Sequence, residues 1–389
     1  MKKGKVLLIQ ADTTQTLPMA KSLYKKGYEV HVVVSSRLTY GYGTRYAAKR
    51  FLFSDYHNVE SYFRFIQDIL KNDSYDFIIP MADEGAVVLS KYRDELGKLT
   101  TFKVPDYETF QKGYDKHKLM EVCAENGFPH PKTLSINGSD VSVYDIDSLK
   151  YPVLIKPNIS CGARGITYVE TPQKLKDVFP KIFSNFGSCH IQEFIPAGGG
   201  QVKVQLYVDE RGKLVQSSVI SKIRWYPNRG GSSCCNQSVD NEKIVDTCYK
   251  VLKEIGWVGF SDFDTIEDPR TGELLIMEIN PRVPACIKTA FESGVDWGDV
   301  ILSEYGNLPH KKYESEKGIF LRHLGFDTLW FLNSDTRFKV KPSWFKFFGK
   351  NIHYQDMNGW SDPLPFILGS VGNIMKQLSP SFRKAKSGI

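Results

Sequence analysis

Apolar and polar stretches alternate regularly over the first hundred residues. Apolar runs of strand length at 5–10, 28–34 and 76–80 alternate with helical patterns at 14–26, 59–70 and 84–96. Strands that alternate with helices are typical of a parallel, doubly wound sheet. We therefore predict an α/β domain over residues 1–105. Its first strand leads into Ala11-Asp12-Thr13-Thr14 and not into GxGxxG, so we do not expect this domain to bind NAD.

The pattern changes after residue 106. Short strands now follow one another, with a hairpin turn at Asp209-Glu210-Arg211-Gly212 and a strong amphipathic helix over 240–255 that Gly256 ends. Residues 224–236 are polar and small, which predicts a loop. We expect an α+β domain with mainly antiparallel strands over 106–310, followed by a small aromatic and basic extension over 311–389.

Composition indicates a soluble globular protein. The chain has 389 residues, of which 41% are hydrophobic and 24% charged, and no apolar run is long enough for a transmembrane helix. The apolar run after the basic N-terminus is too short for a signal peptide. Seven cysteines without a CxxC pair favour a reducing compartment, so we expect a cytoplasmic protein.

The net charge of +7 lies in the last part of the chain, where residues 311–389 contain 13 Lys or Arg and 6 Asp or Glu. A basic, aromatic tail could contact an anionic surface, either a membrane or nucleic acid. The more common arrangement packs the aromatic residues under solvated lysines. We therefore expect no nucleic-acid partner, and a peripheral membrane contact is the less favoured alternative.

The stretch 261–282 carries the strongest chemical signal. It predicts two strands joined by a polar turn, with Asp264 in the first strand and Glu278 in the second, directly before Asn280-Pro281-Arg282. A carboxylate in an apolar strand is costly unless it is compensated. Oxygen ligands from Asp264, Glu278 and Asn280 would suit Mg²⁺, and Arg282 would lie where a phosphate is held. An ordinary hairpin with solvated acids is the alternative.

A second signal is a lysine at the end of a predicted strand. Residues 151–156 form an apolar strand that ends in Lys156-Pro157, and the loop 158–165 that follows is rich in small residues. Free N–H groups in such a loop can surround phosphate oxygens, and glycine lets the backbone come close. The segment lacks the GxxxxGK[ST] pattern, so it is not a Walker loop.

In this order and spacing the chain resembles the ATP-grasp superfamily over about residues 1–300. The segments that carry the resemblance are Lys116, Lys156-Pro157, the glycine loop, Gln192-Glu193-Phe194-Ile195 and Glu278-Ile279-Asn280-Pro281-Arg282. The chain looks most like stand-alone enzymes of the carbamoyl-phosphate-synthase-like or carboxylate–amine ligase-like kind. The resemblance implies a Rossmann-like domain followed by two α+β subdomains that sandwich ATP, with a lid at about 130–195.

The resemblance also implies roles for the residues that match the ATP site. Lys116 and Lys156 match the cations that hold the phosphates. The loop over the β- and γ-phosphates would be formed by Ser160, Gly162, Arg164 and Gly165. The strand that reads the adenine edge, largely through its backbone, would be formed by Gln192, Glu193, Phe194 and Ile195. Gln201 takes the position of the acidic residue that usually holds the ribose, and it carries no charge.

The remaining roles concern the metal and the reaction. Asp264 and Glu278 match the two metal carboxylates, Asn280 the ligand of a second metal ion, and Arg282 the arginine that steadies the transferred phosphate and the acyl intermediate. The implied cofactors are ATP and two Mg²⁺ ions, with Mn²⁺ as an alternative metal. Two metal ions, two lysines and an arginine would offset the repulsion between a carboxylate and a triphosphate.

These roles predict an ADP-forming ligase. A carboxylate attacks the γ-phosphate, and an amine then displaces phosphate from the acyl phosphate. Both substrates would be small molecules, and Arg224 with Gly231 and Ser232 would grip the acceptor carboxylate. Two alternatives stay open, which are phosphorylation of bicarbonate or carbamate and a non-catalytic ATP-binding protein. A homodimer is an open alternative to a monomer.

Overall fold

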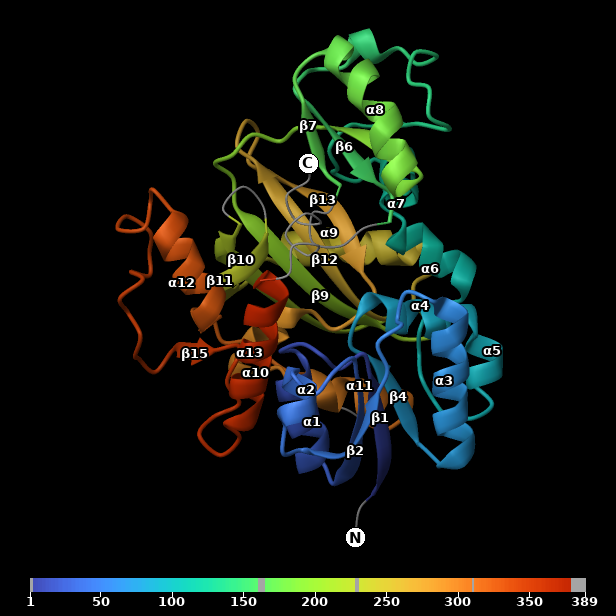
Figure 1. Cartoon of the computed structure of the whole chain (residues 1–389), viewed down its shortest axis with the longest axis vertical. Helices are drawn as coiled ribbons and strands as arrows, with labels where there is room; N and C mark the ends of the chain where they lie inside the picture. Colours follow the sequence, from blue (N-terminus) through green and yellow to red (C-terminus); the bar gives the residue numbers. More distant parts are fainter. Residues whose placement is uncertain (1–2, 160–164, 228–230, 310, 379–389) are drawn as a thin grey trace.

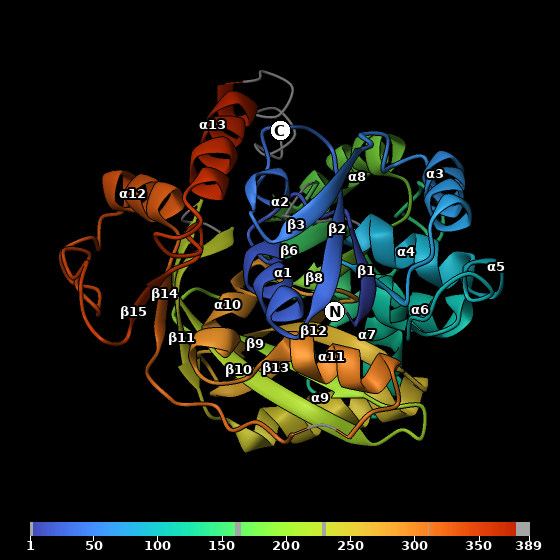
Figure 2. The same ribbon diagram turned by 90° about the horizontal axis from the view of Figure 1, so that it is seen from below.

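The protein is built around three β-sheets that follow one another along its longest axis (Figure 1). The computed structural model describes residues 3–159, 165–227, 231–309 and 311–378. The N-terminal sheet and the sheet of the lid lie at opposite ends, and a large sheet lies between them (Figure 1). Figure 2 looks along this axis from the side of the N-terminal sheet. Within the described ranges, no helix combines the length and the apolar character needed to cross a membrane.

The N-terminal sheet is parallel, as the alternating pattern predicts. Its strand order is β3-β2-β1-β4. The strands are β1 (Gly4–Ile9), β2 (Tyr28–Val34), β3 (Ala47–Leu52) and β4 (Phe77–Pro80), and the helices are α1 (Thr16–Lys25), α2 (Tyr40–Gly43), α3 (Val59–Asn72), α4 (Asp83–Lys91) and α5 (Arg93–Leu96). β3 and α2 were not predicted from the sequence. Only the first residue of β3 is fully buried, so this edge strand lacks a clear apolar pattern.

The lid has a small antiparallel sheet of order β5-β8-β6-β7. Its elements are β5 (Thr133–Ser135), η1 (Ile146–Ser148), β6 (Val153–Pro157), β7 (Thr167–Val169), α8 (Pro172–Phe186) and β8 (Cys189–Glu193). Val153, Ile155 and Val169 on the sheet pack with Leu175 and Phe179 of α8. Because β6 pairs with β8, Lys156 and Gln192 lie on adjacent strands.

The large sheet has seven strands in the order β13-β12-β9-β10-β11-β14-β15. Its first five strands are β9 (Gln201–Val208), β10 (Leu214–Tyr226), β11 (Ser232–Val239), β12 (Gly259–Asp268) and β13 (Glu273–Asn280). The helices of this part are α6 (Tyr107–Tyr114), α7 (Lys116–Glu125), α9 (Glu242–Ile255), η2 (Ala285–Ile287), α10 (Lys288–Glu292) and α11 (Trp297–Tyr305). The predicted loop over 224–236 is wrong, because β10 continues to Tyr226 and β11 begins at Ser232.

The two faces of this sheet differ in polarity. On β9, Val202, Val204 and Leu206 pack in the core with α9, which buries Val251 and Leu252. Side chains alternate between the faces of a strand, so Lys203 and Gln205 must point to the opposite side. A polar row thus runs across the face that looks away from α9.

The last part of the chain adds two strands to the large sheet. Its elements are β14 (Phe320–Arg322), α12 (Leu324–Asn333), β15 (Ile352–Tyr354) and α13 (Leu364–Leu378). β14 pairs antiparallel with β11, and β15 pairs parallel with β14. α13 packs on α2 of the N-terminal domain. The tail therefore touches both the central sheet and the N-terminal domain (Figures 1 and 2).

Candidate active site

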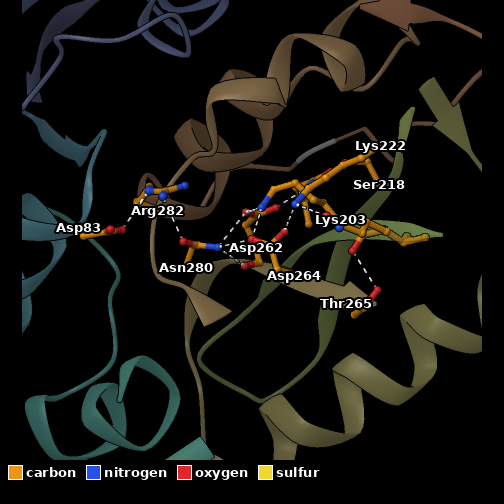
Figure 3. Close-up of polar contacts among 12 residues, drawn as sticks. Asp83, Lys203, Ser218, Lys222, Asp262, Asp264, Thr265, Asn280 and Arg282 are labelled. Atoms are coloured by element: carbon orange, nitrogen blue, oxygen red, sulfur yellow. Dashed lines mark hydrogen bonds and ion pairs between the residues drawn. The ribbon is translucent and has the colours of Figure 1, made fainter. Parts of the chain in front are cut away.

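The predicted carboxylates meet on the polar face of the large sheet. Asp264 lies opposite Glu278 in the β12–β13 pair, and Asp262 lies opposite Asn280. On the other side of β12, Asp264 lies opposite Lys203. Because directly opposed residues share one face of a sheet, these side chains form a continuous polar cluster. Figure 3 shows Lys203, Asp262 and Asp264 of this cluster, with Asn280 and Arg282 leading from them toward Asp83.

Lys203 is the cation at the centre of the cluster. Its Nζ lies 2.8 Å from Asp262 Oδ2 and 2.6 Å from Asp264 Oδ2. Lys222 Nζ lies 2.8 Å from Asp264 Oδ1. Burial works against the charge of Lys203, but the two carboxylates outweigh it and raise its pKa. Burial likewise opposes the charge of Asp264, and the two lysines nevertheless hold its pKa well below the usual range.

Asp262 is the least accessible member of the cluster, with no exposed surface. Its Oδ1 accepts a hydrogen bond of 2.8 Å from Gln205 Nε2, besides the ion pair with Lys203. Burial raises the pKa of this carboxyl group, although Lys203 opposes the shift. The sequence analysis did not name Asp262, Lys203 or Lys222.

The two predicted phosphate lysines approach Glu278 from different elements. Lys116 is the first residue of α7, and its Nζ lies 3.2 Å from Glu278 Oε2. Lys156 is the second-last residue of β6 and is buried, and its Nζ donates a hydrogen bond of 2.5 Å to Gln192 Oε1. Burial lowers the pKa of Lys156 to about 8, Glu278 opposes this shift, and Lys116 adds to it. The fold thus unites two cations and a carboxylate that are far apart in sequence.

Arg282 connects this site to the N-terminal domain. Its Nε lies 3.0 Å from Asp83 Oδ1, in the first turn of α4. Its Nη2 donates a hydrogen bond of 3.1 Å to Asn280 Oδ1, and Asn280 Nδ2 in turn donates one of 3.1 Å to Asp264 Oδ2. Asp83 was also missed, because only the fold brings α4 against the end of β13.

The oxygen donors fit Mg²⁺, which takes carboxylate and amide oxygens together with phosphate oxygens and water. Asp264, Glu278 and Asn280 supply such donors from one face of the β12–β13 hairpin. In this structure these oxygens are paired within the protein. Lysine ammonium groups form ion pairs with the carboxylates of Asp264 and Glu278, and Arg282 donates a hydrogen bond to the amide oxygen of Asn280. Across the described ranges, no cluster of three or more His, Cys, Asp or Glu side chains is arranged to hold a metal. Asp264, Glu278 and Asn280 are thus the oxygen donors that would hold a metal ion, and the carboxylate of Asp262 beside them is buried and paired with Lys203.

The predicted adenine strand is partly engaged within the protein. Gln192 donates through Nε2 to Thr133 Oγ1 at 3.1 Å, besides accepting from Lys156. The amide of Glu193 donates to Lys132 O at 2.8 Å, and that of Phe194 to Pro152 O at 3.4 Å. The adenine contact of residues 192–195 stays a prediction.

The phosphate loop and the ribose contact also stay predictions. Ser160, Gly162 and Arg164 lie outside the described residues. Gly165 is described and has a φ of +75°, and a Cβ there would lie 2.8 Å from the Pro157 ring. A side chain at this position would be strained for both reasons. Gln201, the predicted ribose ligand, accepts a hydrogen bond of 3.3 Å from Lys222 Nζ through Oε1.

The structure corrects the prediction for Arg224. This residue is 1% exposed, and its Nε and Nη2 lie 2.6 Å and 2.9 Å from the two carboxylate oxygens of Asp327. Arg322 Nε donates to the same carboxylate at 2.7 Å. Arg224 is thus a buried structural residue that fixes α12 to β10 and is not available to a substrate. Gly231 and Ser232 lie at the turn end of the β10–β11 hairpin, where Ser232 pairs with Tyr226, and their substrate role stays a prediction.

Comparison with known proteins shows what the part of the chain that holds this site is similar to. Residues 114–286 match the family model described as an ATP-grasp domain, and this range contains both lysines, both carboxylates, Asn280 and Arg282. This part of the chain is therefore similar to the ATP-grasp domain family, in line with the resemblance of the sequence motifs.

Curated relatives are ligases and synthases. D-aspartate ligase of Enterococcus faecium is 25% identical over 241 residues, which are 58% of this chain and 57% of the relative. The large chain of carbamoyl phosphate synthase of Thermotoga neapolitana is 24% identical over 278 residues, which are 68% of this chain and 25% of the relative. The chain thus spans less than two thirds of the length of these relatives.

Solved structures confirm the fold. Biotin carboxylase of Campylobacter jejuni matches with a TM-score of 0.67 and 17% identity, over 80% of this chain and 74% of that one. L-amino acid ligase of Bacillus licheniformis matches with a TM-score of 0.61 and 14% identity, over 78% of this chain and 74% of that one. The predicted Rossmann-like domain followed by an ATP-grasp fold is confirmed at the level of the fold.

Proposed function

We propose that this protein is an ATP-dependent, ADP-forming ligase that activates a carboxylate as an acyl phosphate and joins it to an amine. One observation carries the proposal. Lys116, Lys156 and Glu278 come together from three separate elements of the ATP-grasp domain, next to Arg282. The similarity to D-aspartate ligase and to L-amino acid ligase supports this type of reaction over other uses of the fold.

The chain's own residues account for the main demands of the reaction. Lys116 and Lys156 would bind the phosphates and offset their charge, because both ammonium groups lie at the edge of the carboxylate cluster. Arg282 would hold the γ-phosphate against the substrate carboxylate, with Asp83 and Asn280 fixing its guanidinium. Bound Mg²⁺, held by Asp264, Glu278 and Asn280, would draw charge from the triphosphate. Positioning and neutralisation are thus the protein's share of the catalysis.

Finer points follow from the same site. We propose two Mg²⁺ ions, replaceable by Mn²⁺, because two carboxylates and an amide can be shared between two ions that also bind phosphates. A cytoplasmic setting is supported by the six described cysteines, which are all free and buried. We also propose that the chain is divided into residues 1–105, 106–310 and 311–389. The last of these parts contributes strands to the large sheet.

A second candidate function is phosphorylation of bicarbonate or carbamate. The similarity to the large chain of carbamoyl phosphate synthase favours it. The two reactions share the phosphate lysines and the carboxylates and differ in the group that attacks the γ-phosphate. A non-catalytic ATP-binding protein is the least favoured alternative, because the chain keeps Lys156, Asp264, Glu278, Asn280 and Arg282 together.

Phosphate release by the purified full chain tests the proposal. The chain is incubated with ATP, Mg²⁺ and a panel of carboxylates and amines, and with bicarbonate alone. Release that needs both a carboxylate and an amine supports the ligase, and release stimulated by bicarbonate alone supports the second function. ATP binding without release across the panel would contradict both.

A matched pair of variants on β13 tests the metal site. Glu278→Gln removes the charge of a predicted metal ligand and should lower phosphate release by about 100-fold or more. Glu273→Gln, on the exposed end of the same strand, should leave it unchanged. Both variants should melt like the parent, because the Glu278 side chain is 31% exposed and has one ion-pair partner at 3.2 Å. Equal phosphate release from the two variants would show that Glu278 is not a metal ligand.

A further inference from the structure

Helix α13 has one face packed against the protein and one face that is apolar and exposed. The packed face carries Gly369 and Gly372. A Cβ on Gly372 would lie 2.0 Å from Leu38 O, and one on Gly369 would lie 2.6 Å from ring atoms of Tyr40. The absence of side chains at these two positions lets α13 approach α2 closely. The orientation of the helix on the body is therefore fixed.

The opposite face of α13 is a continuous apolar stripe. Spacings of three and four residues place its members on one side of the helix. These side chains are between 42% and 63% exposed, and they are Leu364, Ile367, Val371, Ile374, Met375 and Leu378. An exposed single leucine needs no explanation, but a full stripe of large apolar side chains marks an interaction surface.

Further exposed apolar side chains lie in the same part of the chain. Leu332, Phe338, Phe345, Phe348 and Trp360 are between 59% and 90% exposed. Together with the stripe, eleven of the nineteen large hydrophobic side chains that are exposed in the described ranges fall within residues 332–378. Both views place α12 and α13 on the same side of the molecule (Figures 1 and 2). The exposed apolar surface is thus concentrated in the tail.

The charge exposed around this surface is positive. From residue 336 to the end, the sequence contains two acidic residues, Asp356 and Asp362. Both are buried, at 1% and 2% exposure. The exposed charged side chains over 336–378 that the structure describes are lysines, namely Lys339, Lys341, Lys346, Lys350 and Lys376. Asp335, which directly precedes this range, is exposed, so five exposed lysines outnumber one exposed acid. Large apolar and aromatic side chains with this surplus of lysines match the chemistry of an anionic lipid surface.

We propose that the tail, through the α13 stripe and the neighbouring aromatic residues and lysines, docks the protein on an anionic membrane surface. The exposure of these aromatic side chains favours membrane contact over the arrangement expected from the sequence, in which aromatic residues pack under solvated lysines. α13 would lie in the plane of the interface with its stripe among the lipid chains. The proposal does not depend on the ligase activity.

A second copy of the chain is the competing occupant, because spacings of three and four also suit pairing of two helices. Two features disfavour it. The stripe spans about two heptads, whereas coiled coils usually extend over three or four or more. The charge of α13 is a single lysine, Lys376, so two paired copies would have no opposite charges to fix their alignment. A membrane satisfies both the apolar stripe and the unbalanced lysines.

Vesicle sedimentation with the full chain tests the proposal. The chain should sediment with vesicles of phosphatidylcholine and phosphatidylserine more strongly than with phosphatidylcholine alone, and salt should weaken the binding. The double variant Ile367→Ser/Ile374→Ser should lower vesicle affinity by about tenfold or more. Each of Lys346→Gln and Lys350→Gln should lower it by about fivefold. The control Leu52→Ser/Val143→Ser, which changes exposed apolar side chains elsewhere, should bind like the parent.

Every variant should melt at the temperature of the parent, because each altered side chain is exposed. Thermal melting therefore serves as the control for the fold. Failure of the parent to sediment with either kind of vesicle would overturn the proposal. Equal binding by the Ile367→Ser/Ile374→Ser variant and the control would also overturn it. A parent that is dimeric in ultracentrifugation, does not bind vesicles and becomes monomeric in the isoleucine variant would assign the stripe to a second copy instead.

Discussion

Replacement of Lys203 by methionine should weaken the fold by removing one buried cation from between two carboxylates. Methionine keeps much of the length and volume of the side chain and removes the charge. Lys203 is 8% exposed and lies within 2.8 Å of both Asp262 and Asp264. Water therefore cannot readily replace the ammonium group as the partner of these two carboxylates.

The size of the effect follows from the partners that remain. Asp264 would keep its ion pair with Lys222 at 2.8 Å. Asp262 would keep the hydrogen bond from Gln205 at 2.8 Å but would lose its ion-pair partner while fully buried. Breaking a buried ion pair by removing one partner costs about 3–5 kcal/mol. Since one carboxylate and not two is left uncompensated, we expect the free energy of unfolding to fall by about that amount.

The assay is urea unfolding of the full chain, followed by circular dichroism. Lys213→Met, at an exposed position after the β9–β10 turn, is the control and should change the unfolding free energy by less than about 0.5 kcal/mol. The double variant Lys203→Met/Asp262→Asn should be more stable than Lys203→Met alone, because it also removes the uncompensated charge.

The loss should also depend on pH. Burial already raises the pKa of Asp262 above that of an unfolded aspartate, and removal of Lys203 raises it further. Between the unfolded and folded pKa values the folded state binds more protons, so the stability of Lys203→Met should rise as the pH falls. A Lys203→Met variant as stable as Lys213→Met, or a double variant no more stable than the single one, would refute the reasoning.

Three further predictions concern other parts of the chain. ATP affinity, measured by calorimetry, should fall roughly eightfold between about pH 7.5 and about pH 9, because Lys156 with a pKa of about 8 loses its proton in this range. The Lys156→Arg variant should not show this fall in affinity. The same fall in the variant would show that another group titrates. Asp327→Asn, which leaves two buried arginines without their carboxylate, should lower the unfolding free energy by about 3–5 kcal/mol, whereas the exposed Asp335→Asn should not. Gly372→Ala should push α13 off α2 and speed its cleavage by protease, since a Cβ would lie 2.0 Å from the Leu38 carbonyl oxygen; cleavage at the parent rate would contradict this packing.

Sequence reasoning located the parts of the site that depend on local structure. Asp264 and Glu278 could be predicted to face one another, because a single hairpin joins their strands and the turn fixes the pairing. Lys156 could be placed at a strand end for the same local reason. The order of these motifs along the chain then indicated the ATP-grasp fold, which the solved structures confirm.

The missed residues depend on strands that are distant in sequence. Lys203 lies opposite Asp264 only because β9 pairs with β12, and no local pattern sets that register. One signal was present: Lys203 and Gln205 interrupt an apolar strand at alternate positions, which predicts a polar face. Arg224 was misassigned because its partner Asp327 lies in the tail, beyond the region that the family resemblance covers.

The position of β14 in the large sheet has a consequence for synthesis of the chain. β11 ends at Val239, and its outer neighbour begins only at Phe320. A nascent chain that stops after residue 286 and before Phe320 has the whole matched range but leaves β11 as an open edge, with unpaired backbone groups that could recruit a strand of another chain. Arg224 would also lack Asp327 in such a chain. The C-terminal residues therefore protect the edge of β11 from pairing with other chains. A fragment that ends with the matched range should precipitate under conditions in which the full chain stays in solution.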